Sequence, residues 1–98
     1  MLKIKYAARM KKDMRTCQKR NYDFSLFEKI VEKLKIPEPL DIRNKDHNLI
    51  GDYAGYRECH ISPDWLLIYR QSGEYLELYR TGTHSDLFNW VKEKTKGK

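Results

Sequence analysis

The chain has 98 residues, 40% of them hydrophobic, and a formal net charge of +6. We expect a single domain over residues 1–98 with a modest core, because a domain of this size buries only about 60–65% of its unfolded surface. The composition argues against a disordered chain, no apolar run approaches the roughly 18 residues that cross a bilayer, and the positive charge favours a polyanionic partner such as nucleic acid or an acidic protein.

The first third of the chain predicts one strand and two helices. Residues 2–6 alternate apolar and basic, as in a half-buried strand. Helical spacing then takes over, with a strongly basic outer face, at Ala7, Met10, Met14 and Cys17. Asp23 is a suitable N-cap for a second helix, which Pro37 and Pro39 end. The apolar stripe of that helix consists of Phe24, Phe27, Ile30, Val31 and Leu34.

The rest of the chain predicts a sheet. Residues 40–55 look irregular, with Asn and Gly as breakers. Strands are expected at 56–61, 65–70 and 75–80, and the second is apolar enough to lie centrally. A short helix is expected from Asp86 to about 94, with Leu87, Trp90 and Val91 on its apolar side. The order of elements predicts an α+β domain: a strand, then two helices packed on a twisted, mostly antiparallel sheet, and a short C-terminal helix.

Two cysteines, Cys17 and Cys59, stand alone without metal-type spacing. We interpret them as reduced thiols of a cytosolic protein. The N-terminus, Met1-Leu2-Lys3-Ile4-Lys5-Tyr6, lacks the apolar core of a secretion signal, so a cytoplasmic location is expected.

All three histidines, His47, His60 and His84, fall between residues 45 and 88. Cleaving RNA without a metal needs a base that takes a proton from the 2′-hydroxyl, an acid that protonates the leaving 5′-oxygen, and a cation for the phosphorane. Histidine suits either proton-transfer role. Asp64 could be the base or could orient His60, and Arg80 could hold the phosphate with its planar fork. Trp65 and Phe88 could stack on an unpaired base.

Each of these residues also has a structural interpretation. His47 could be a plain surface residue, Asp64 a turn residue after Pro63, and His84 a helix cap. Arg80 could pair with Glu77 or Glu58. Trp65 and Phe88 are more often core residues than ligand platforms. No two histidines show ligand spacing on one element, so we predict neither a metal site nor any other cofactor.

Three segments resemble a known family. They are Lys45-Asp46-His47-Asn48-Leu49, the stretch from Gly55 through Arg57-Glu58-Cys59-His60 and Asp64-Trp65 to Tyr69, and Arg80-Thr81-Gly82-Thr83-His84-Ser85-Asp86-Leu87-Phe88. In this order and spacing they resemble the RelE-like toxins of bacterial type II toxin–antitoxin systems, and among them the YafQ branch. The resemblance runs from about residue 2 to residue 88.

The resemblance implies a bacterial, cytoplasmic endoribonuclease that cuts mRNA in the A site of the 30S ribosomal subunit and is neutralised by a cognate antitoxin. It implies no membrane and no small-molecule cofactor. Carried over by motif, the catalytic residues are His47, His60, Asp64, Arg80 and His84. Trp65 and Phe88 match the aromatic neighbours of the site, and Lys45 and Arg57 are further candidates for substrate contacts.

Residues 89–98 depart from the family pattern, since YafQ-like chains usually end close to the Phe. This extension or tail could pack Phe88 into a helix or alter docking. Two other functions remain open. One is a non-catalytic toxin of the same fold, like the ParE-like gyrase inhibitors, which lack this histidine set. The other is a basic RNA-binding module without turnover.

Overall fold

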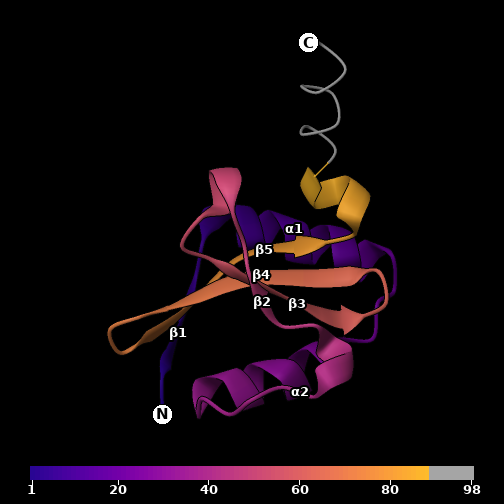
Figure 1. The fold of residues 1–98 in the computed structure, drawn as a ribbon. Coiled ribbons are helices and arrows are strands. Elements are labelled where there is room, and N and C mark those ends of the chain that lie inside the picture. Colours follow the sequence, from indigo (N-terminus) through magenta and orange to yellow (C-terminus); the bar gives the residue numbers. More distant parts are fainter. Residues whose placement is uncertain (89–98) are drawn as a thin grey trace.

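The structure is a computed structural model that describes residues 1–88. Five strands and two long helices account for most of it, with two short 3₁₀ turns between α2 and β3 (Figure 1). In chain order the elements are β1 (Lys3–Tyr6), α1 (Ala8–Lys19), α2 (Phe24–Lys35), η1 (Ile42–Asn44), β2 (His47–Asn48), η2 (Gly51–Tyr53), β3 (Arg57–Ser62), β4 (Trp65–Ser72) and β5 (Tyr75–Gly82).

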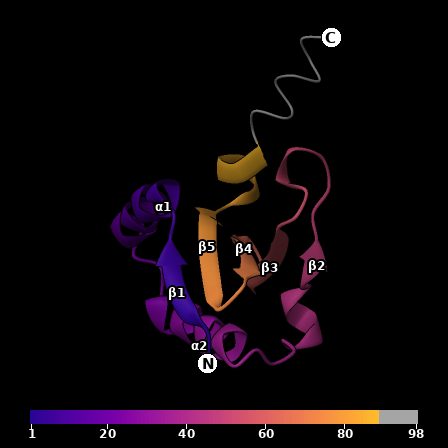
Figure 2. The same cartoon turned by 90° about the vertical axis from the view of Figure 1, so that its left-hand side faces the viewer.

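The strands form one sheet in the order β1-β5-β4-β3-β2, which runs from left to right in Figure 2. β1 pairs with β5 in parallel, and the other three pairings are antiparallel. β4 lies in the middle, as its apolar sequence predicted. The mostly antiparallel α+β fold is therefore confirmed.

The two helices cover one face of the sheet, where the main core lies. Their predicted apolar stripes supply Met10 and Cys17 from α1 and Phe27, Ile30, Val31 and Leu34 from α2. They pack on the alternate sheet residues Cys59, Ile61, Leu67, Leu76 and Leu78. Burial raises the pKa of Cys17 to about 11 and also raises the pKa of Cys59, so both thiols are protonated near neutral pH.

The opposite face carries a smaller cluster. Leu66 and Ile68 of β4 are fully buried there under Leu87, which belongs to a helical turn over residues 84–88. Tyr53, Tyr56, Tyr79 and Phe88 pack around this cluster. Since successive strand residues face opposite sides, the residues that flank Cys59 in β3, Glu58 and His60, belong to this face.

Two expectations about local structure need correction. Residues 40–55 are not wholly irregular, because His47 and Asn48 pair with Glu58 and Arg57 to form β2. The last helix begins at His84 rather than Asp86, because Thr83 caps it. Its expected continuation to residue 94, with Trp90 and Val91, lies outside the described residues. Within residues 1–88, no helix has the length and apolar character needed to cross a membrane.

Candidate active site

Histidines from three separate segments meet near one end of β3 and β4. His60 lies on β3, His84 begins the helical turn after β5, and His47 lies on β2. The rings of His60 and His84 are 5.6 Å apart between centroids. Although 24 residues separate these two histidines in the chain, the sheet brings them into one site.

Glu58 lies between two of the histidines. Its Oε1 is 3.6 Å from Nε2 of His47 and 3.7 Å from Nε2 of His60, which is ion-pair distance if either imidazole is protonated. The residue is only 4% exposed, and its Oε2 has no hydrogen-bond partner within residues 1–88. Sequence analysis missed Glu58 as a site residue. The available signal was its position two residues before His60 in a strand, which places both on one face.

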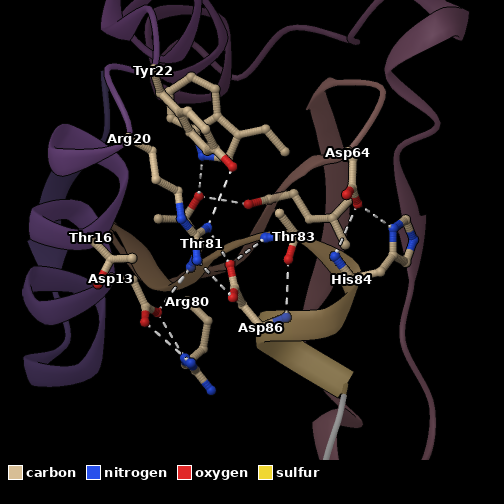
Figure 3. Close-up of polar contacts among 12 residues, drawn as sticks. Asp13, Thr16, Arg20, Tyr22, Asp64, Arg80, Thr81, Thr83, His84 and Asp86 are labelled. Atoms are coloured by element: carbon tan, nitrogen blue, oxygen red, sulfur yellow. Dashed lines mark hydrogen bonds and ion pairs between the residues drawn. The ribbon is translucent and has the colours of Figure 1, made fainter.

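Asp64 orients His84. Its Oδ1 accepts hydrogen bonds from Nδ1 of the His84 ring at 3.0 Å and from the His84 backbone N–H at 3.1 Å (Figure 3). These bonds lower the pKa of the Asp64 carboxyl, so it is ionised at neutral pH. Since a carboxylate only accepts, Nδ1 of His84 carries a proton and Nε2 is left for other partners. The alternative in which Asp64 orients His60 is therefore not the arrangement found.

The loop before β2 holds the other two histidines. Nδ1 of His47 donates to the Lys45 carbonyl at 2.6 Å, and the Asn44 side-chain amide donates to the His60 carbonyl at 2.7 Å. The first bond fixes the proton of His47 on Nδ1 and turns its Nε2 toward Glu58. Lys45 adopts a left-handed conformation with φ of 48°, which lets the chain turn from η1 into β2.

Arg80 forms a buried ion pair with Asp13 of α1. Nε and Nη2 of Arg80 donate to the two carboxylate oxygens at 2.8 and 3.2 Å, and the side chains are 10% and 14% exposed. The Thr81 backbone N–H donates to the same carboxylate. The suggested partners Glu77 and Glu58 are wrong, since Glu77 pairs with Arg70. Arg80 is thus fixed in place beside α1 (Figure 3).

The predicted substrate contacts have different environments. Trp65 is 3% exposed and packs against Tyr22 and Phe24 on the helix side of the sheet, so its ring is covered where stacking on a base was expected. Phe88 lies on the same face as the histidines, with its ring centroid 6.3 Å from that of His84. Arg57 is bound to Asp46 and Asn48.

Lys45 is exposed. It lies directly after η1 and two residues before His47, whereas Arg57 lies at the start of β3, three residues before His60.

A capping box fixes the backbone on both sides of His84. Thr83 Oγ1 accepts from the Asp86 N–H, and Asp86 Oδ2 accepts from the Thr83 N–H. Arg20, at the end of α1, donates to both Asp86 oxygens at 2.6 and 3.1 Å. A side chain at Gly82 would meet Asp86 Oδ2 at 2.8 Å, so glycine is required there. These contacts tie the His84 turn to α1 (Figure 3).

Asp86→Asn is expected to destabilise the protein at pH 7 by about 1–2 kcal/mol, because Arg20 lowers the pKa of Asp86 to about 2 in the folded state. A carboxyl group with a lowered pKa stabilises the fold at pH values above its ordinary pKa of 3.8. This stabilisation is lost as the pH falls toward 2, the pKa in the folded state. Urea unfolding between pH 3 and 7 should therefore give a difference in the free energy of unfolding between wild type and variant that becomes smaller below about pH 4. A difference that stays constant across this pH range would contradict the stabilising role of the Arg20–Asp86 ion pair.

One group of residues could hold a metal ion. Glu58, His60 and His84 each offer one ligand atom, and these atoms lie within 4.8 Å of one another. The unpartnered Oε2 of Glu58 fits such a role. Two imidazoles and a carboxylate suit zinc or copper. Reasoning from spacing on single elements did not reveal this cluster, because its members come from β3 and from the turn after β5.

The arrangement offers an oriented imidazole at His84, a second imidazole at His60 beside the buried carboxylate of Glu58, and an arginine fixed on β5. These are the groups required for proton transfer to and from two oxygens of a phosphodiester.

Comparisons with known proteins show the family to which the chain belongs. The family described as "Bacterial toxin of type II toxin-antitoxin system, YafQ" matches residues 2–89. The mRNA interferase toxin YafQ of Escherichia coli K12 is 40% identical over 86 residues, covering 87% of this chain and 94% of that protein.

Solved structures resemble the whole described fold. The toxin in the E. coli DinJ–YafQ toxin–antitoxin complex superposes with a TM-score of 0.81 at 39% identity, covering 89% of this chain and 97% of that one. A metal-bound toxin from Helicobacter pylori superposes with a TM-score of 0.84 at 39% identity, covering 90% of this chain and all of that one.

Proposed function

Because this chain belongs to the YafQ family of type II toxin–antitoxin toxins, we propose that it is an endoribonuclease that cuts mRNA in the ribosomal A site and so inhibits translation. The observation that carries the proposal is the pairing of His60 and His84 across one site, each beside a carboxylate. A non-catalytic toxin would have no need for that arrangement.

His84 acts as the general acid in this mechanism. Asp64 holds its Nδ1 proton and stabilises the imidazolium, which leaves Nε2–H to protonate the departing 5′-oxygen. Asp64 accepts two hydrogen bonds from His84, so it serves as a positioning residue. His60 is therefore assigned the role of general base.

His60 then takes the proton of the 2′-hydroxyl. Glu58 stabilises the charge that forms on this imidazole, and His47 lies on the other side of the same carboxylate. Arg80 supplies positive charge for the phosphorane, with Asp13 holding its Nε and Nη2. Phe88, half-buried beside His84, is the aromatic partner for a base near the cleaved bond.

Toeprinting on programmed ribosomes tests the proposal. Added protein should produce a new mRNA end within the A-site codon, and His84→Ala should not. Stalled ribosomes with intact mRNA would point instead to an RNA-binding module, and loss of gyrase activity without mRNA cleavage would point to a ParE-like toxin.

We predict that cleavage needs no metal and that added Zn²⁺ or Cu²⁺ inhibits it. A histidine that binds a metal through its lone pair cannot exchange a proton there, and the candidate ligands include His60 and His84. Cleavage rates with EDTA and with increasing zinc check this. Activity that disappears in EDTA and returns with zinc would show that a metal takes part in the reaction.

An antitoxin is the proposed cytoplasmic partner, as in the DinJ–YafQ complex of E. coli. The basic outer face of the N-terminal region favours an acidic, partly helical segment, since opposite charge speeds encounter. It consists of Lys3, Lys5, Arg9, Lys11, Lys12, Arg15, Lys19 and Arg20. Association with the neighbouring gene product should slow as salt rises, and that product should relieve toxicity. A neighbour that neither co-elutes nor protects the cell would contradict this.

A further inference from the structure

We infer that a pocket beside the histidine cluster is a nucleotide subsite that holds the base next to the scissile phosphate and so contributes to codon preference. The inference rests on the proposed endoribonuclease function for its biological meaning. The pocket has a volume of about 370 Å³ and is lined by residues 43–45 and 60–63. This volume lies within the roughly 300–1,000 Å³ range of small-ligand pockets.

The pocket exists because β2 is short. β2 pairs only with Arg57 and Glu58, so it leaves the outer edge of β3 from His60 onward without a strand neighbour. The η1 loop packs there instead and contacts the strand through the Asn44 amide. A register shift in the β3–β4 pairing between His60 and Ser62 bends this end of the strand.

The lining suits a nucleotide better than an apolar ligand. Pro63 is exposed and provides an apolar surface for the face of a base, and the Ser62 hydroxyl can reach a base edge. Arg43 is 83% exposed and is paired with Asp41, whereas Lys45 has no ion-pair partner among residues 1–88. Lys45 is thus the cation available for a phosphate.

The pocket is joined to the catalytic groups directly. His60 is part of its wall, Asn44 holds the His60 carbonyl, and the Lys45 carbonyl holds the His47 ring. A base seated there would place its phosphate beside His60. Occupancy of the pocket and the position of two histidines are therefore linked through residues 44 and 45.

Direct binding tests the pocket without relying on cleavage. Titration of ¹⁵N-labelled protein with each of the four 2′-deoxynucleoside 5′-monophosphates should shift amide signals in residues 43–45 and 60–63. Ser62→Leu, which fills the pocket, should weaken binding at least about tenfold. Ser72→Leu, at the far end of β4, is the matched control and should bind like wild type. An absence of shifts in these residues, or equal binding by Ser62→Leu, would overturn the inference.

Cleavage of a codon panel on ribosomes then separates the two proposals. Ser62→Leu should change the relative rates among codons, whereas His84→Ala should lower all rates together. If wild type cleaves nothing yet binds nucleotides in the pocket, the endoribonuclease proposal fails, and the pocket is a nucleotide-binding site without a role in codon preference. If wild type cleaves and Ser62→Leu keeps the wild-type codon profile, the subsite fails.

Discussion

His84→Ala is expected to slow single-turnover cleavage of mRNA on programmed ribosomes by about 10²–10⁴-fold, the usual effect of losing a general acid. The variant should fold normally, because His84 is exposed and its backbone is held by the Thr83–Asp86 capping box, which the substitution leaves intact. Wild-type rates in a folded His84→Ala protein would remove this residue from the mechanism.

Asp64→Asn is the companion variant, because Asp64 acts through His84. It should reduce the cleavage rate less than His84→Ala does. Added to His84→Ala in a double variant, it should not lower the cleavage rate any further. Independent, multiplicative effects of the two substitutions would show that Asp64 does not work through His84.

Asp13→Ala is expected to destabilise the fold by about 3–5 kcal/mol, because it leaves the buried Arg80 guanidinium without its carboxylate. It also removes the acceptor of the Thr81 N–H. Urea unfolding gives the free energy directly. Glu74→Ala is the matched control, since Glu74 pairs with Lys3 at the surface, and it should change stability little. A small loss for Asp13→Ala would contradict the buried pairing.

A double variant separates the structural and chemical roles of Arg80. Replacing the pair with apolar residues, as Asp13→Leu with Arg80→Met, should recover much of the stability. Cleavage should remain low, because the cation for the phosphorane is gone. A stable double variant that cleaves like wild type would show that Arg80 is a structural residue alone.

The periodicity of apolar residues predicted most helices and strands, because the spacing within each element reflects which of its faces is buried. The stripes of α1 and α2 and the alternation in β5 correspond to faces that the structure buries, whereas in β1 only Ile4 is partly buried and Tyr6 is exposed. β2 could not be predicted in this way, since two residues carry no period and their pairing with β3 is set by the intervening loop. The family resemblance is confirmed by the match over residues 2–89.

Sequence supplied the residue types of the site better than their contacts. Arg80 finds its carboxylate on α1, 67 residues earlier, and nothing local points to Asp13. Trp65 adjoins Asp64 in the chain, yet β4 turns its ring to the helix side while Asp64 stays at the surface. Glu58 could have been predicted as a site residue, because alternation along a strand places it on the same face as His60.

The central claim is that the histidine cluster cleaves RNA by activating the 2′-hydroxyl of the RNA itself. One substitution in the substrate tests this claim. An mRNA with a single 2′-deoxynucleotide immediately 5′ of the scissile phosphate should occupy the ribosomal A site normally and resist cleavage there. The matched all-ribose mRNA should be cut to a 2′,3′-cyclic phosphate and a 5′-hydroxyl end. Cleavage of the deoxy-substituted mRNA at the same bond and rate would contradict the account.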